Sequence, residues 1–236
     1  MRKYFLCLVC AGLMVSAATL QSCTNDEDGA YVLAYPNALV TVKPNADNTS
    51  FRLQLNDSTE VYPVNMRQSP FGTKEVRALV NYRTPTEAEL AAGGIYADLP
   101  CVYINWIDSI RTKSVIKSMA TDEENLRKYG SDPLEIIDDW TTVVEDGYLT
   151  LRFRTKWGGG KHVVNLVHRQ DVNTPYYFSL YHDARGDTSG KTGDAMVAFK
   201  LDGMEIPQNK TEMLTLEWQS YTGRKTIRLK FYESKD

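Results

Sequence analysis

Cysteine is scarce in this chain, which has four in 236 residues. Three of them, Cys7, Cys10 and Cys23, lie within the first 23 residues, and the body of the chain has only Cys101. A disulfide needs two cysteines, so none is expected within the chain once its N-terminal segment is cleaved and Cys23 is modified, as argued below. Packing and hydrogen bonding must then hold the fold together.

An excess of basic residues is also missing. Lysine and arginine number 27 against 30 aspartates and glutamates, which gives a formal net charge of −3, or −5 if Arg2 and Lys3 leave with a leader peptide. A net-negative surface repels phosphate backbones, so nucleic acid is not expected as a partner. The hydrophobic share of 42% is ample for a packed core.

The first 22 residues have the pattern of a secretory signal peptide. A positive start at Arg2 and Lys3 precedes the uncharged, apolar stretch 4–20, which is short of the roughly 20 residues of a membrane-spanning helix. The stretch ends in Leu20-Gln21-Ser22-Cys23, which resembles a bacterial lipobox, although Gln21 is less typical there than a small residue. We expect cleavage before Cys23 and lipidation of its thiol. The alternatives are ordinary signal-peptidase cleavage or a retained membrane helix.

Residues 23–29 are expected to form an acidic tether, with Asp26, Glu27 and Asp28 in succession. This segment resembles the export signal that sends lipoproteins of gut Bacteroidota to the outer face of the outer membrane. The alternative is a solvated linker that its charges keep extended. We therefore expect an outer-membrane lipoprotein of the cell envelope, held in the membrane by its N-terminal lipid and exposed at the cell surface.

Residues 30–120 show the alternation of apolar and polar residues that is typical of half-buried strands, and no stretch after Gly29 has sustained helical periodicity. The clearest candidates are the segments 31–42, 51–55, 75–83 and 102–106. This pattern indicates roughly five strands, a number that suits a small barrel.

One helix is predicted at the seam between two halves of the chain, within the linker 121–138. Residues 121–124 read Thr-Asp-Glu-Glu, a capping box in which the threonine hydroxyl and a glutamate carboxylate satisfy N–H groups at a helix start. Gly130 provides a left-handed stop, and Pro133 prevents continuation.

Residues 139–236 alternate more cleanly, and about seven short strands are expected there. They fall at 140–144, 149–154, 163–169, 176–182, 194–201, 214–219 and 226–231. This number in roughly 100 residues is typical of an immunoglobulin-like β-sandwich. One buried and one wet face per strand is the pattern of antiparallel sheets.

Several segments of this half are similar to the NigD-like lipoprotein family. They are residues 132–140, 145–153, 157–162, 164–167, Leu216, Trp218 and 220–223. The resemblance implies a lipobox, an N-terminal OB-like barrel and a C-terminal β-sandwich. Members of the family, which is named after a bacteriocin-associated operon, are usually described as candidate immunity proteins. No catalytic residues can be carried over from it.

A glycine run, Gly158-Gly159-Gly160, lies between Trp157 and His162 and between two predicted strands. Glycine tolerates the positive φ of tight turns, which favours a structural turn. The functional alternative is a ligand loop in which Trp157 stacks on a sugar ring.

A second loop, 185–193, resembles a phosphate-binding loop between Gly186 and Thr192. Three residues separate its glycines where four are required, and a strand is predicted to follow instead of a helix, so we reject the phosphate site. Arg185-Gly186-Asp187 also spells an integrin-binding tripeptide that arises often by chance. We nevertheless propose this loop, with Arg185, Asp187 and Lys191, as a second contact segment, since loops are free of the pairing that constrains strand residues.

The remaining polar residues show no active-site pattern. His162, His168 and His182 lack metal-ligand spacing and are expected at wet strand positions. Ser179, His182 and Asp183 supply the groups of a hydrolytic triad without the turn motif that a nucleophile needs. Cys101 is expected to be a small buried hydrophobe, and the cluster of Tyr176, Tyr177 and Tyr181 fits either recognition or sheet packing.

The sequence therefore predicts an all-β, non-enzymatic surface lipoprotein. An OB-like barrel at 30–120 precedes the helix and linker at 121–138 and an immunoglobulin-like sandwich at 139–236. It is expected to need no metal or cofactor and to bind a protein or glycan partner, in bacteriocin immunity or another envelope role. The alternative is a carbohydrate-binding surface lipoprotein, and the remote alternative is a hydrolase with an undetected site.

Overall fold

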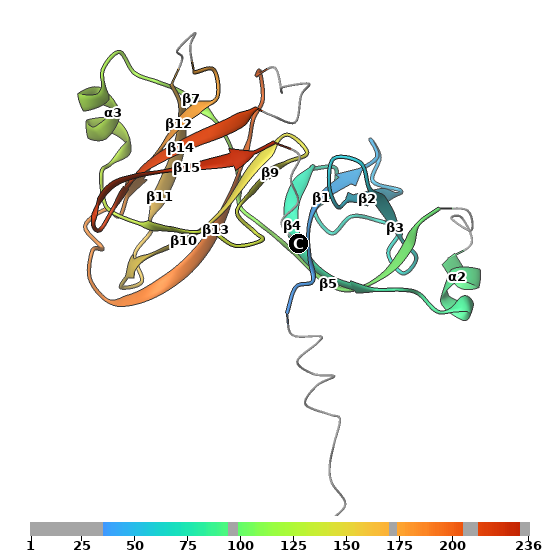
Figure 1. The fold of residues 1–236 in the computed structure, drawn as a ribbon. Helices are drawn as coiled ribbons and strands as arrows, with labels where there is room; N and C mark the ends of the chain where they lie inside the picture. Colours follow the sequence, from blue (N-terminus) through green and yellow to red (C-terminus); the bar gives the residue numbers. More distant parts are fainter. Residues whose placement is uncertain (1–34, 94–98, 170–173, 205–211, 232–236) are drawn as a thin grey trace, which may run out of the picture. The chain divides into compact units, whose positions relative to one another are not determined.

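The computed structural model describes residues 35–93, 99–169, 174–204 and 212–231 (Figure 1). The predicted signal peptide, Cys23 and the acidic tether lie outside the described residues. In the described part of the chain, neither helix has the length and apolar character needed to cross a membrane.

The N-terminal half forms a closed barrel of five strands in the order β1-β2-β3-β5-β4 (Figure 1). They are β1 (Ala38–Pro44), β2 (Phe51–Gln54), β3 (Glu60–Pro63), β4 (Val76–Arg83) and β5 (Cys101–Ser109). Alternate side chains such as Val40, Val42 and Leu53 are fully buried in the barrel core. The predicted small barrel is confirmed.

A short helix that the periodicity did not predict, α2 (Glu87–Gly93), lies between β4 and β5. It has only seven residues and buries none of its side chains, so no repeated apolar position marked it in the sequence. Its start is nevertheless capped, because the Glu89 N–H donates to the Thr86 hydroxyl at 3.3 Å and the Thr86 N–H donates to the Glu89 carboxylate at 2.8 Å. The signal was the Thr86-Glu87-Ala88-Glu89 sequence, a second capping box.

The C-terminal half is a sandwich of two five-stranded sheets. The first sheet contains β6 (Thr112–Ser114), β8 (Glu135–Ile137), β9 (Val143–Glu145), β10 (Tyr148–Trp157) and β13 (Lys191–Lys200). The second contains β7 (Ile116–Lys117), β11 (Val163–His168), β12 (Tyr177–Asp183), β14 (Met213–Ser220) and β15 (Gly223–Lys230). Their inner faces share one core, in which Leu151, Phe178 and Leu216 are fully buried. The predicted β-sandwich is confirmed.

The pairing within the sandwich is less uniform than the alternation suggested. Most pairs are antiparallel, as predicted, but β12 pairs with β14 in parallel, and β6 and β7 each join a sheet edge in parallel. Alternation reports which face of a strand is buried and carries no information on strand direction, so it could not reveal these pairs. The strand predicted from Trp140 begins only at Val143, because an Asx turn precedes it: the Asp139 carboxylate accepts the Thr141 N–H at 2.9 Å.

The predicted seam helix is α3 (Asp122–Tyr129), and both arms of its capping box are present. The Glu124 N–H donates to the Thr121 hydroxyl at 3.2 Å, and the Thr121 N–H donates to the Glu124 carboxylate at the same distance. The stop at Gly130 has a positive φ of 90°. A Cβ there would also lie 2.5 Å from the His182 carbonyl oxygen, so glycine is required by close approach as well as by its backbone angle.

The sequence placed the barrel at residues 30–120 and the helix and linker at 121–138. The short strands β6 and β7 precede residue 120 and still pair with β13 and β11 of the sandwich. The two halves also share an apolar cluster, in which Leu39 on β1 and Ile110 pack with Val143 and Ala198. The barrel and the sandwich therefore bury side chains against each other.

Candidate functional site

The two predicted contact segments converge at one end of the sandwich. Strands β10 and β13 pair over ten residues, with Trp157 opposite Lys191. This register brings the loop after Trp157 next to the loop before Lys191. Asp187 joins the two loops, because its carboxylate accepts the N–H of Gly158 at 2.8 Å and the N–H of Gly160 at 2.6 Å. These backbone donors lower the pKa of Asp187 below its usual value.

The glycine run is explained by this contact. A Cβ on Gly158 or Gly160 would lie 2.6–2.7 Å from a carboxylate oxygen of Asp187, so larger residues would push the carboxylate away. The glycines are thus needed because the Asp187 carboxylate approaches the backbone closely, as well as for the geometry of the turn. Arg185 and Lys191 lie at the ends of the second loop and are exposed.

Trp157 is the most exposed tryptophan among the described residues, with 54% of its surface accessible. Its indole N–H donates to the Gly160 carbonyl at 2.8 Å, which ties the ring to the loop. The side chain is therefore both available and held in place. An exposed tryptophan in a fixed orientation is suited to binding, because tryptophan is enriched among the residues that dominate binding energy.

The histidines separate into a pair and a single residue. His162 Nε2 lies 3.4 Å from the Asp187 carboxylate, and His162 Nδ1 shares a hydrogen bond of 2.9 Å with His182 Nε2. His168 stacks on Phe178 and contacts the Pro175 carbonyl instead. The prediction of a wet position for His182 is wrong: it is 2% exposed, and burial, with His162 beside it, lowers its pKa. Within the described ranges, no three histidine, cysteine or acidic side chains cluster as a metal site would need.

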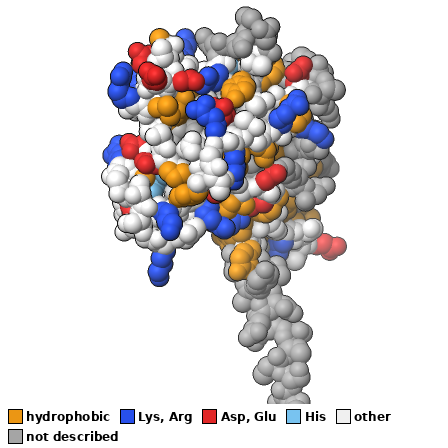
Figure 2. All heavy atoms as spheres, turned by 60° about the vertical axis from the view of Figure 1, so that its left-hand side comes forward, with side chains coloured by type: hydrophobic (Ala, Val, Ile, Leu, Met, Phe, Trp, Pro, Cys, Tyr) orange, Lys and Arg blue, Asp and Glu red, His pale blue; other side chains and the backbone are white. Residues whose placement is uncertain are grey.

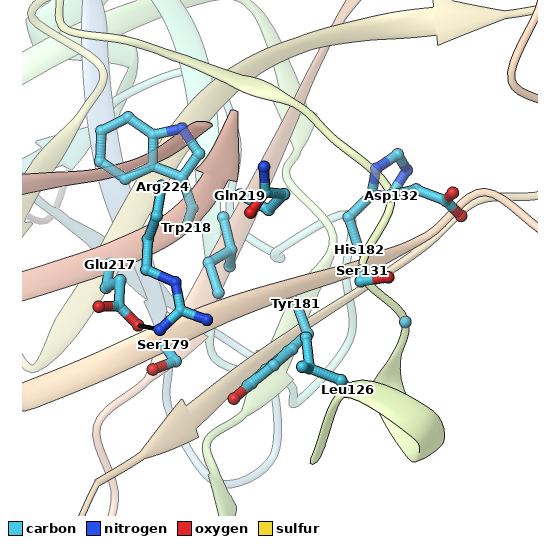
Figure 3. Close-up of a pocket in the computed structure, with 12 residues that line it drawn as sticks. Leu126, Ser131, Asp132, Ser179, Tyr181, His182, Glu217, Trp218, Gln219 and Arg224 are labelled. Atoms are coloured by element: carbon cyan, nitrogen blue, oxygen red, sulfur yellow. Dashed lines mark ion pairs between the residues drawn. The ribbon is translucent and has the colours of Figure 1, made fainter. Parts of the chain in front are cut away.

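A small cavity lies beside His182, between α3 and strands β12 and β14 (Figure 3). Its volume is about 30 Å³, enough for a water-sized molecule and too small for an organic ligand. Ser179 and Trp218 also line it, and the Glu217–Arg224 ion pair, 3.3 Å long, lies at one side (Figure 3). In the described part of the chain, no hydrogen bond connects Ser179, His182 and Asp183 into a triad.

A larger cleft of about 400 Å³ lies next to Trp157. Of the predicted site residues it is lined by Trp157 and His162, whereas Gly158, Gly159, Gly160, Arg185, Asp187 and Lys191 lie outside its lining. Sequence reasoning missed the other side chains around it, in particular Arg111, Lys113 and Asp194. The pairing of β6 with β13 places Lys113 there, and the Ala198 N–H donates to the Arg111 carbonyl at 3.0 Å just before β6. No local pattern encodes these long-range contacts.

Cys101 is the first residue of β5 and is half-buried. Burial raises the pKa of its thiol above the usual value, which lowers the share of reactive thiolate at neutral pH. This position is more open than the buried one that the sequence predicted.

Comparison with known proteins agrees with both halves of the fold. The model of the NigD-like N-terminal OB domain matches residues 39–110, and that of the NigD-like C-terminal beta sandwich domain matches residues 117–231. No curated protein matches the chain.

Solved structures of three bacterial proteins are similar. A protein from Parabacteroides distasonis ATCC 8503, provisionally named toxin-related, is 28% identical over 82% of this chain and 91% of its own, with a TM-score of 0.63. A NigD-like immunity protein from Bacteroides caccae ATCC 43185 is 22% identical over 82% and 92%, with a TM-score of 0.53. A protein from Bacteroides fragilis NCTC 9343, provisionally named a lipoprotein, is 11% identical over 84% and 99%, with a TM-score of 0.51. At these identities the last two show a shared fold alone.

The two domain models together span nearly all of the described residues, in the order in which the barrel and the sandwich occur. The chain belongs to the NigD-like family.

Proposed function

We propose that this protein is a lipid-anchored, non-enzymatic binding protein of the cell envelope, and that it contacts a protein partner through the loops 157–162 and 185–193. The observation that carries the proposal is Trp157, exposed and tied to Gly160 on a loop that Asp187 holds from the opposite side. Tryptophan is enriched among residues that dominate binding energy. A loop ordered before binding also loses less conformational entropy on association.

We further propose that the partner is a bacteriocin-like toxin and that the role is immunity. Support comes from the names of two similar structures, one an immunity protein and one provisionally toxin-related. The lipid anchor would hold the domain at the outer membrane, facing the surroundings from which such a toxin arrives. The lipobox at Cys23 and the provisional lipoprotein name of a protein with the same fold support this location.

The proposal can be tested in the organism that encodes the chain. Deletion of the gene is expected to raise sensitivity to bacteriocins of neighbouring strains, and the wild-type gene should restore resistance. Trp157→Ala should fail to restore it. Trp140→Ala is the matched control, because Trp140 is also exposed, at 37%, and lies away from both loops in sequence. Equal sensitivity of all strains to every bacteriocin would contradict immunity.

The second candidate is carbohydrate binding, which the exposed face of Trp157 also favours, since indole rings stack on sugar rings. Sandwiches and OB-folds both present loops and aromatic side chains to oligosaccharides. A glycan-array screen of the soluble domain would distinguish the two. Saturable binding of a glycan that Trp157→Ala abolishes and Trp140→Ala preserves would favour the carbohydrate reading over a protein partner.

A further inference from the structure

The cleft beside Trp157 lies at the edge where the two sheets of the sandwich meet. Phe153, Thr155 and Trp157 of β10 and residues 193–197 of β13 line it from the first sheet. Val163 and Val164 of β11 line it from the second. Lys113 on β6 spans the edge, because its ammonium donates to the Val164 carbonyl and, at 2.7 Å, to the Asn165 side chain.

Most of this lining is apolar. Phe153 and Val164 are buried core residues whose side chains border the cleft, whereas Ala195 is exposed there. A volume of about 400 Å³ falls in the range of small-molecule sites, roughly 300–1,000 Å³, which are also mainly apolar with a few polar groups. The cleft is therefore large enough for an organic ligand, unlike the cavity beside His182.

The charged side chains around the cleft are mostly basic. Arg111, Lys113 and Lys161 line it, and in the described part of the chain none of them forms an ion pair with an acidic side chain. The one acidic residue of the lining, Asp194, is already paired with Arg154 at 2.6 Å and with Arg152 at 2.7 Å. The face shown in Figure 2 has basic, acidic and hydrophobic side chains interspersed. The chain as a whole has a formal net charge of −3, so the basic excess around the cleft is local.

Lys113 is partly buried among neutral hydrogen-bond acceptors and beside another cation. Burial, together with the nearby Arg111, lowers the pKa of the Lys113 ammonium. Its two hydrogen-bond acceptors are a carbonyl and an amide oxygen, which are neutral. An anion near this side chain would stabilise the charged form, since an opposite charge offsets the cost of burial.

We propose that the cleft binds a small organic carboxylate: an apolar body, such as an acyl chain, lies against Phe153, Val164 and Ala195, while the carboxylate faces Arg111, Lys113 and Lys161. The cleft shares Trp157, Lys161 and His162 with the loop 157–162, but the proposal rests on the volume and charges of the cleft and not on the proposed function. The occupant is a free amphiphile. A peptide with an acidic end also carries a carboxylate, so the test compares its binding with that of the amphiphile.

The probe is decanoate, titrated below its micelle concentration into the protein without its signal peptide and lipid, which contains both the barrel and the sandwich. Calorimetry measures the binding. We expect saturable binding to one site, at least about tenfold tighter than that of decanol, because charge-assisted hydrogen bonds are lost with the alcohol. Octanoate should bind more weakly than decanoate by about fourfold per CH₂ removed. No saturable binding, or equal binding of decanol, would overturn the proposal. So would tighter binding of an acidic peptide than of decanoate.

Three variants locate the site. Ala195→Trp fills the cleft from an exposed position and should abolish decanoate binding. The double variant Arg111→Gln/Lys161→Gln should weaken decanoate at least about tenfold and leave decanol unchanged. Lys156→Gln is the control, because Lys156 is exposed on β10 between the cleft residues Thr155 and Trp157 but does not line the cleft. Each variant should unfold at the wild-type temperature, and an equal loss of binding in Lys156→Gln would show that the effect is one of net charge.

Discussion

Arg77 on strand β4 of the barrel forms an ion pair of 2.5 Å with Glu145 on strand β9 of the sandwich, and both side chains are buried. The guanidinium also donates to the hydroxyls of Thr41 and Thr150, at 2.9 and 3.2 Å. Burial raises the pKa of Glu145, and the Arg77 charge opposes that rise. The pair lies among contacts between the two halves of the chain, so it connects them through one fully enclosed polar network.

This pair predicts a large cost of removing one partner. Arg77→Met should lower the free energy of unfolding by about 3–5 kcal/mol, because Glu145 is left buried without its counter-charge. Chemical denaturation monitored by tryptophan fluorescence measures the change. Arg52→Met is the control: its pair with Glu60 is about two-fifths exposed on both sides and should contribute less than about 1 kcal/mol. A small effect of Arg77→Met would mean that water reaches the pair.

The sandwich is predicted to fold alone only if the strands and the helix that precede residue 140 are kept. A fragment of residues 111–236 keeps all ten sandwich strands and α3, and should fold and unfold cooperatively. A fragment of residues 140–236 lacks β6, β7, β8 and the buried Leu134, and should be markedly less stable or unfolded. Circular dichroism with thermal melts compares the two. If neither fragment folds, the barrel and the sandwich form one folding unit.

Acid stability provides a test of Asp194. The guanidinium of Arg154, with that of Arg152, lowers the pKa of Asp194 from 3.8 to about 2. A carboxylate with a lower pKa in the folded chain stabilises the fold above its unfolded pKa, and that contribution is lost as the pH falls through the folded value. Asp194→Asn should therefore be slightly less stable than wild type at neutral pH, by less than about 1 kcal/mol because the pair is largely exposed.

The difference between wild type and Asp194→Asn should shrink as the pH falls from about 4 to 2, which denaturation curves across that range would measure. Asp108→Asn is the control, since Asp108 is exposed and forms no ion pair within the described residues. A stability difference that persists at pH 2 would contradict the assignment.

The lipid anchor is predicted to depend on one thiol. Cys23→Ala should block incorporation of a labelled fatty acid and release the protein from the membrane fraction, because no other residue of the lipobox carries an acceptor thiol. Cys101→Ala is the control and should keep both the label and the location. Equal label on the wild type and on Cys23→Ala would refute the lipobox.

Local features of this fold were readable from the residues themselves. Apolar side chains at Leu149, Leu151 and Phe153 alternate with polar ones, and that period of two marks a strand. It did not reveal that Thr150, on the polar side, is also fully buried. The helix start at Thr121 was equally local, because its cap is completed three residues later. The run Gly158-Gly159-Gly160 predicted a loop after Trp157, because glycine tolerates the positive φ of tight turns.

Tertiary structure alone decided which of these features meet. The contact of Asp187 with Gly158 and Gly160 spans 27–29 residues, that of Lys113 with Asn165 spans 52, and that of Arg77 with Glu145 spans 68. Such contacts depend on strand order and direction, which are set by the packing of whole sheets and leave no periodic trace in the sequence. The sequence by itself thus determined the longer strands, the cap of α3 and the resemblance to the family, whereas the short strands β3, β6, β7 and β8 carried no such pattern. The cleft, its three basic side chains and the buried ion pair exist only because distant strands are brought together.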